Sequence, residues 1–273
     1  MSLRHLCLIL GDQLDRESSL FRRFDPRTDR LWMAEVHEES THVWSHKQRI
    51  ALFLAAMRHF AAELTERGWP LDYRRLGEHQ DPDLGTALAG ALRRWQPQRV
   101  RLVMPGDYRV LQQIRGTCSD LRTPLDILQD DHFLSTPDEF HQWAADRKQL
   151  RLEYWYRQLR QRHAILLEPD ASPAGGNWNF DVKNRGAFAK SGPSGVPAAP
   201  RFKPSQITRE VIKLVNREFG DHPGRLDRLD WPVTPAQSEQ LELRFLDHAL
   251  PHFGRYQDAC WSGQASASDS IRG

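Results

Sequence analysis

The chain contains 273 residues, 39% of them apolar and 27% charged, so it is long enough to bury a hydrophobic core of ordinary size. Its formal net charge of +2 argues neither for nor against a nucleic-acid partner, and its three cysteines lie too far apart for a disulfide framework or a metal knuckle. The apolar runs Leu6–Leu10 and Ile50–Met57 are too short for a signal peptide or a membrane span. We therefore expect a cytoplasmic protein that has no membrane partner.

From the N-terminus to about residue 134, apolar runs typical of buried strands alternate with amphipathic runs typical of helices. Strands are expected over 3–10 and 30–36, and a long amphipathic helix follows over 46–67. The other elements expected here are strands over 71–76, 99–105 and 124–130 and helices over 83–95 and 108–115. This alternation predicts an α/β fold with a Rossmann-like, open, parallel five-stranded sheet that is covered on both faces.

The pattern changes in the second half of the chain, where the expected strands stop. Thr136, Pro137 and Glu139 form a typical helix start, and an aromatic-rich helix is expected over 150–166. The Gly/Pro/Ser-rich connection that follows, over 169–204, is longer than loops inside compact domains usually are. We therefore interpret it as functional or interdomain.

Further helices are expected over 205–219 and 234–253. The predicted division of the chain is an α/β domain (1–134), a helical connector with an interdomain loop (135–204), the start of a second, helical domain (205–261) and a disordered tail (262–273).

Polar residues follow three of the expected strands, in the sequences GDQ, EVHEE and PGDYR. In open parallel sheets, ligands bind beyond the carboxyl ends of the strands. The residues that we assign to a pocket there are Asp12, Gln13, Glu35, Pro105, Gly106, Asp107 and Tyr108. Two interpretations stay open: a site for a heteroaromatic ring, held by amides and carboxylates, or turn and cap residues that hold no ligand.

Several other chemistries find no support. The sequence has neither GxGxxG nor GxxxxGK[ST], and GDQLD after the first strand would repel phosphate, so we reject a generic nucleotide-binding enzyme. It has no GxSxG, and Asp130 and Asp131 are interpreted as cap and turn residues. His37, His42 and His46 straddle a strand end, a turn and a helix start, so no metal site is predicted.

Basic residues gather late in the chain. Between Lys183 and Arg217 there are eight lysines or arginines against one acid, Glu210, and the segment GGNWNFDVKNR (175–185) precedes most of them. Cations can neutralise phosphates and aromatic rings can stack on unpaired bases. The residues that we assign to a DNA contact are Asn177, Trp178, Asn179, Lys183 and Arg185. The helix just upstream also interleaves basic residues with Tyr154, Trp155 and Tyr156. For that helix the alternative stays open that its charges form a solvated face and its aromatic residues belong to a core.

Six motifs together resemble a known family: LILGDQL, AEVHEESTHVWSHKQRIALFLAAMRHFA, YWYRQLRQRHAILLE, GGNWNFDVKNR, WPVT and FGRYQDACW. They are similar to bacterial photolyase-related proteins, the iron–sulfur branch of the cryptochrome/photolyase superfamily, which includes prokaryotic (6-4) photolyases. They occur in the family's order and cover the chain to about Trp261.

The resemblance implies a light-dependent repair protein for UV-damaged DNA. Its α/β domain would hold a ribityllumazine-type antenna chromophore near Glu35 and the GDQ and PGDYR loops, and the segment 175–185 would lie between the domains near DNA. FAD and a four-cysteine iron–sulfur cluster belong to a further helical domain of full-length relatives. Since the family pattern stops after Cys260 and Trp261, we expect a chain truncated before that domain and inactive on its own.

The alternative is a stand-alone binding module for a lumazine- or flavin-type chromophore, without catalysis. The two interpretations differ in the surface that they expect. The start of a larger helical domain should leave partly uncovered the side chains Val211, Ile212, Val215, Leu241, Phe245 and Leu250, and should self-associate through these exposed helices. A self-sufficient module should be monomeric.

Overall fold

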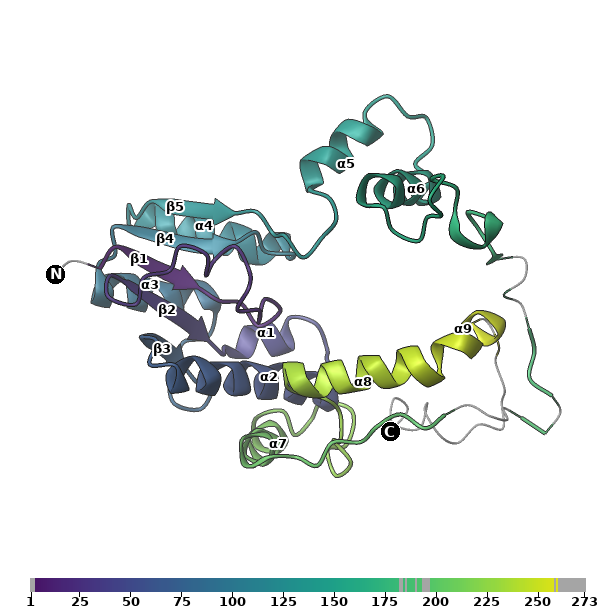
Figure 1. Cartoon of the computed structure of the whole chain (residues 1–273). Coiled ribbons are helices and arrows are strands. Elements are labelled where there is room, and N and C mark those ends of the chain that lie inside the picture. Colours follow the sequence, from purple (N-terminus) through teal and green to yellow (C-terminus); the bar gives the residue numbers. More distant parts are fainter. Residues whose placement is uncertain are drawn as a thin grey trace.

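The computed structural model describes residues 3–181, 184, 186–189, 191–192, 197–257 and 259 (Figure 1). Its centre is a sheet of five parallel strands in the order β3-β2-β1-β4-β5, which confirms the predicted Rossmann-like fold. The strands are β1 (His5–Leu8), β2 (Asp29–Ala34), β3 (Leu71–Arg74), β4 (Arg99–Val103) and β5 (Leu125–Leu128). Parallel pairing of these short apolar runs requires crossovers, and the segments between most of them supply helices.

Four helices lie among the strands in sequence: α1 (His37–Thr41), α2 (Lys47–Glu66), α3 (Leu84–Trp95) and α4 (Tyr108–Asp120). Alternate residues of β1 serve the two faces of the sheet, because successive strand side chains point in opposite directions. Leu6 and Leu8 pack in the same cluster as residues of α3 and α4, whereas Cys7 and Ile9 pack in a cluster with residues of α2. Helix α1 was not predicted, because five residues are too few to show a helical period.

Helix α7 (Gln206–Glu218) packs along α2 and closes a third core cluster. Val211 and Val215 are completely buried there, so the expectation that they would be partly uncovered is wrong for these two side chains. Ile212 is partly exposed, as expected. The reason lies in α2, whose residues Ile50 and Leu54 turn toward α7 and require an apolar cover.

The remaining helices are α5 (Pro137–Ala144), α6 (Leu152–His163), the 3-10 turn η1 (Ala174–Gly176), α8 (Pro235–His248) and α9 (Leu250–Tyr256). Thr136 caps α5 in the predicted capping box with Glu139. Helices α5 and α6 lie apart from the sheet, and α8 and α9 extend away from it in another direction (Figure 1).

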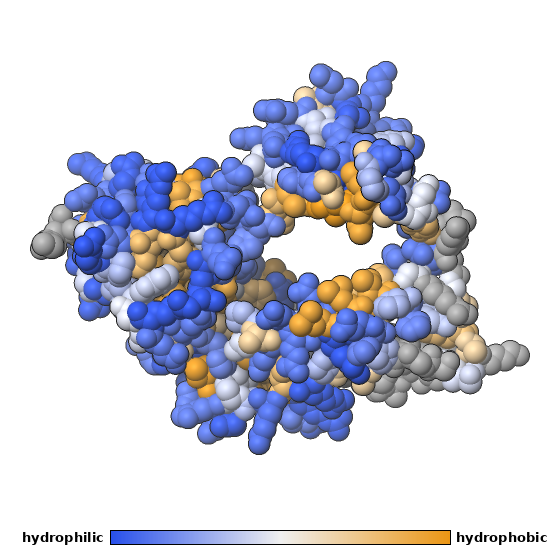
Figure 2. All heavy atoms as spheres, in the orientation of Figure 1, coloured by the Kyte–Doolittle hydropathy of each residue, from blue (hydrophilic) through white to orange (hydrophobic). Residues whose placement is uncertain are grey.

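Apolar surface gathers on α5–α6 and on α8–α9 at the sides that face each other across an opening (Figure 2). Phe245 and Leu250 are 37% and 45% exposed, and Leu241 is partly exposed, all three as expected. None of the residues 137–144 and 235–248 is buried. Among the helices described here, none combines the length and the apolar character needed to cross a membrane.

Candidate functional site

A cavity of about 630 Å³ lies beyond the carboxyl ends of β1, β2 and β4, where α1, α2 and the start of α4 enclose it. Six of the seven residues predicted from the strand ends line it: Asp12, Glu35, Pro105, Gly106, Asp107 and Tyr108. Gln13 instead supports the wall, because its side-chain amide donates to the main-chain oxygens of Met104 (3.0 Å) and Val103 (3.4 Å). The strand ends therefore bring most of the predicted set together.

The inner wall of the cavity is apolar and its rim is polar. Buried side chains of Ala34, Ile50 and Met57 belong to the wall. Two aromatic side chains that line the cavity stay open to solvent, Phe53 (39% exposed) and Tyr108 (74% exposed). Such a site suits a planar, largely apolar ring system that carries polar substituents at one end.

Glycine at position 11 lets α2 approach the end of β1. A Cβ there would lie 3.0 Å from Sδ of Met57 and 3.7 Å from the ring of Phe53, both of which line the cavity. The predicted turn GDQ therefore also sets the width of the cavity at this wall.

Glu35 borders the cavity, but its carboxylate is fully occupied by protein groups. Oε1 accepts from Nε of Arg58 (2.8 Å) and from the Tyr73 hydroxyl, and Oε2 accepts from Nη2 of Arg58 (2.7 Å) and from the Leu76 amide (2.9 Å). These four donors fill the usual acceptor positions of a carboxylate. Burial alone would lower the pKa of Arg58, but the hydrogen bond and charge of Glu35 raise it. The network joins β2, β3 and α2 behind the cavity.

A second network fixes the rim. The Asp107 side chain caps α4 by accepting from the Arg109 amide at 2.7 Å. The Arg109 guanidinium reaches α1, where Nη2 donates to Glu39 at 2.9 Å and Nη1 lies 3.5 Å from Glu38. Burial alone would lower the pKa of Arg109, and its hydrogen bond with Glu39 and the charges around it raise that pKa. Asp107 thus holds α4 and, through Arg109, the position of α1.

Sequence reasoning missed the part of the cavity that α1 and α2 supply. These lining residues are Glu39, Ser40, His42, Val43, Ser45, Arg49 and Phe53. Their signal was the polar run HEESTHVWSHKQ between a strand and a long helix, which the prediction treated as a connection. The three histidines of this region make different contacts: His42 lines the rim, His46 caps α2, and His37 stacks on Phe219 at 4.9 Å.

The predicted DNA-contacting segment lies beside α6. Trp178 is half-buried, and the guanidinium carbons of Arg160 and Arg157 lie 5.0 and 5.7 Å from its ring centre. Asn177 and Asn179 are exposed. Lys183 and Arg185 fall outside the described residues. The half-buried Trp178 ring therefore rests on cations, with one flanking amide exposed on each side.

Comparison with known proteins places these observations in a family. A family model described as deoxyribodipyrimidine photo-lyase-related protein matches residues 7–231. The chain belongs to this photolyase-related family. It is also similar to a (6-4) photolyase of Agrobacterium fabrum, with 35% identity over 274 residues that cover 98% of this chain and 53% of the relative. The chain thus spans about half the length of that relative.

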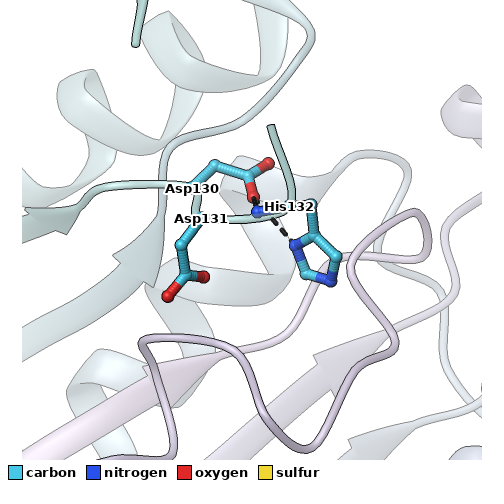
Figure 3. A group of neighbouring side chains, drawn as sticks. All are labelled: Asp130, Asp131 and His132. Carbon is cyan, nitrogen blue, oxygen red and sulfur yellow. Dashed lines mark hydrogen bonds and ion pairs between the residues drawn. The ribbon is translucent and has the colours of Figure 1, made fainter. Parts of the chain in front are cut away.

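In this photolyase-related chain, one group of described residues brings candidate metal ligands together: Asp130, Asp131 and His132, with ligand atoms within 4.8 Å of one another (Figure 3). Each is already paired. Nδ1 of His132 bonds to Asp130 (2.8 Å), Nε2 of His132 lies 2.9 Å from Asp15, and Arg22 pairs with Asp131. We interpret the group as a tether between the loop after β1 and the end of β5.

This tether is expected to depend on pH. The hydrogen bond that His132 donates to Asp130, together with the nearby charge of Asp15, raises the pKa of His132 above its ordinary value. A raised pKa in the folded state means that the tether is complete below the unfolded pKa and weakens as the pH rises through the folded pKa. NMR titration should place the His132 midpoint above 6.5, the ordinary value for histidine, and Asp130→Asn should move it down. A midpoint that Asp130→Asn does not shift would contradict this interpretation.

Proposed function

We propose that this chain is the chromophore-binding part of a photolyase-type protein for light-dependent repair of UV-damaged DNA, and that its cavity takes a ribityllumazine-type antenna chromophore. The observation that carries the proposal is the cavity at the strand ends, with an apolar wall, a polar rim and two open aromatic rings. Family membership adds support, and it favours this function over a stand-alone chromophore carrier.

The residues present fit such a group. Phe53 and Tyr108 would contact its ring, and the rim side chains of Asp12, Ser40 and Asp107 would accept hydrogen bonds from its hydroxylated chain. When bound, the chromophore would supply absorption of light. The protein's own part is to orient the ring and to exclude water along the buried wall.

We assign neither FAD nor an iron–sulfur cluster to the described residues. Cys7 belongs to the core around α2, and Cys118 of α4 belongs to the core on the other face of the sheet. Burial raises the pKa of Cys7 to about 12 and that of Cys118 to about 11, which disfavours the thiolates that a cluster needs. Cys260 lies outside the described residues.

The test is the absorption and fluorescence spectrum of the freshly purified chain, followed by denaturation and identification of any released molecule. Release of a ribityllumazine without flavin supports the proposal. If the purified chain is colourless, ribityllumazine is added stepwise and its binding is measured by absorption and fluorescence. Failure to bind it would overturn the chromophore assignment, and release of flavin would assign the cavity to a different ring system.

The DNA part of the proposal rests on the segment around Trp178 and α6. Replacing Trp178 by alanine should weaken binding of lesion-bearing duplex DNA by roughly tenfold, because a stacking surface and its cation contacts are lost. Chromophore content should not change, because Trp178 does not line the cavity. Fluorescence anisotropy measures the affinity, and Trp178→Phe serves as the control that keeps an aromatic ring. Equal affinities for the alanine variant and the parent would remove this assignment.

We also propose that the isolated chain self-associates through its uncovered helices. The exposed apolar side chains of α8 and α9 include Leu243 (55%), Leu246 (44%) and Phe253 (50%). Sedimentation equilibrium should show a concentration-dependent dimer or larger species, and the pair Leu243→Gln and Leu246→Gln should shift the equilibrium toward monomer. A parent chain that is monomeric at all concentrations would argue for a self-sufficient module.

A further inference from the structure

We propose that the loop after α7, residues 219–225, positions one wall of the cavity, and that His222 is the positioning residue through which it acts. The inference rests on the proposed ligand function of the cavity. It joins two parts of the chain that are far apart in sequence, since His222 and Ser45, whose main-chain oxygen it holds, are 177 positions apart.

The wall in question is the connection between α1 and α2, residues 42–46. His42, Val43 and Ser45 of this connection line the cavity. It has little core of its own, because α1 contributes no buried side chain among its five residues and Val43 and Trp44 are 55% and 62% exposed. A wall of this kind needs support from another element to keep one position.

His222 supplies that support with two contacts. Its Nδ1 donates to the main-chain oxygen of Ser45 at 2.8 Å, and its ring stacks on Trp44 with 4.3 Å between centres. His222 itself is only 5% exposed, and Phe219, which is completely buried, meets its ring edge-on at 5.4 Å. The buried Phe219 anchors the loop in the core between α7 and α2, so the position of His222 follows from the docking of α7.

Main-chain oxygens of the same loop clasp the first turn of α2. Pro223 accepts from the Lys47 amide and Gly220 from the Lys47 ammonium group, both at 2.8 Å, and Arg225 accepts from the Gln48 side chain at 3.1 Å. These bonds hold Lys47 and Gln48, which directly follow the connection 42–46, whereas His222 contacts Trp44 and Ser45 within it.

Glycine at 224 is required for this clasp. Its φ of +94° lies in the left-handed region, and a Cβ there would come within 2.1 Å of the His46 ring. The loop is therefore shaped to lie directly on the residue that caps α2.

If docking of the loop 219–225 on residues 42–48 fixes the cavity wall, docking raises the affinity for the ligand. The bound ligand must then favour docking of the loop by the same factor. The direct test compares affinities for added ribityllumazine, measured by fluorescence, in the parent chain, His222→Ala and Leu229→Ala. Leu229 belongs to the same α7–α2 core, whereas the hydrogen bonds to residues 45–48 come from residues 220–225. It is therefore the control for a general loss of stability.

We expect His222→Ala to weaken binding roughly tenfold through the lost hydrogen bond and stacking, and Leu229→Ala to change the affinity of the folded chain less than twofold. His222→Phe, which keeps the stacking alone, should lie between His222→Ala and the parent. In hydrogen exchange, the ligand should protect the Lys47 amide, which the loop holds.

The outcomes separate the two proposals. A parent chain that binds the probe, together with a folded His222→Ala variant of equal affinity, overturns the positioning role and leaves the proposed function standing. Equal weakening by His222→Ala and Leu229→Ala also overturns it, because stability alone would then explain the effect. A folded parent chain that does not bind the probe overturns both.

Discussion

Replacing Glu35 by alanine is expected to lower the free energy of unfolding by about 3–5 kcal/mol. The substitution removes a carboxylate side chain that is completely buried and leaves the Arg58 side chain, 11% exposed, without its buried partner. The Tyr73 hydroxyl and the Leu76 amide lose their acceptor as well. Urea denaturation of the chain without ligand measures the loss directly.

Two further variants separate the charge from the contacts. The double variant Glu35→Leu with Arg58→Met removes both charges and should recover much of the lost stability, since a well-packed apolar pair can replace a buried ion pair. A single alanine variant that loses less than about 1 kcal/mol would show that Arg58 finds water or another partner. Glu35→Gln addresses ligand contact: if the carboxylate serves the fold alone, the folded glutamine variant should bind ribityllumazine like the parent.

The sheet could be predicted because its strands carry an unusually plain signal. Leu6, Leu8, Val100 and Leu102 belong to short apolar runs that alternate with helical periods, and such runs fit buried parallel strands. The docking of α7 on α2 could not be predicted in the same way. The amphipathic pattern of α7 shows that Val211 and Val215 need a cover, but it does not say which distant element supplies it.

In the candidate site, too, some residues could be predicted from the sequence and others could not. Residues at strand ends, such as Asp12, Asp107 and Tyr108, were found because a general rule places ligands there. His42 and Ser45 line the same cavity from a helix connection, and His222 reaches that connection from the far end of the chain. No local pattern encodes such contacts. For Glu35, the sequence predicted its position at the cavity. It could not predict that Arg58 occupies both carboxylate oxygens, because that contact depends on tertiary packing.

Replacing Tyr108 by alanine is expected to weaken ribityllumazine binding roughly tenfold without disturbing the fold. Tyr108 is the first residue of α4 and is 74% exposed, so its ring contributes little to the core. Its position at the cavity makes it free to stack on a planar ligand. Thermal unfolding without ligand should therefore match the parent, while fluorescence titration should show the loss of affinity.

Tyr108→Phe is the matched control, because it keeps the ring and removes only the hydroxyl. If stacking holds the ligand, the phenylalanine variant should bind like the parent and the alanine variant should not. If both variants bind weakly, the hydroxyl is the important group and a hydrogen bond replaces stacking as the explanation. If both bind like the parent, the ring must rest on Phe53 at the other open wall, and Phe53→Ala should then cause the loss.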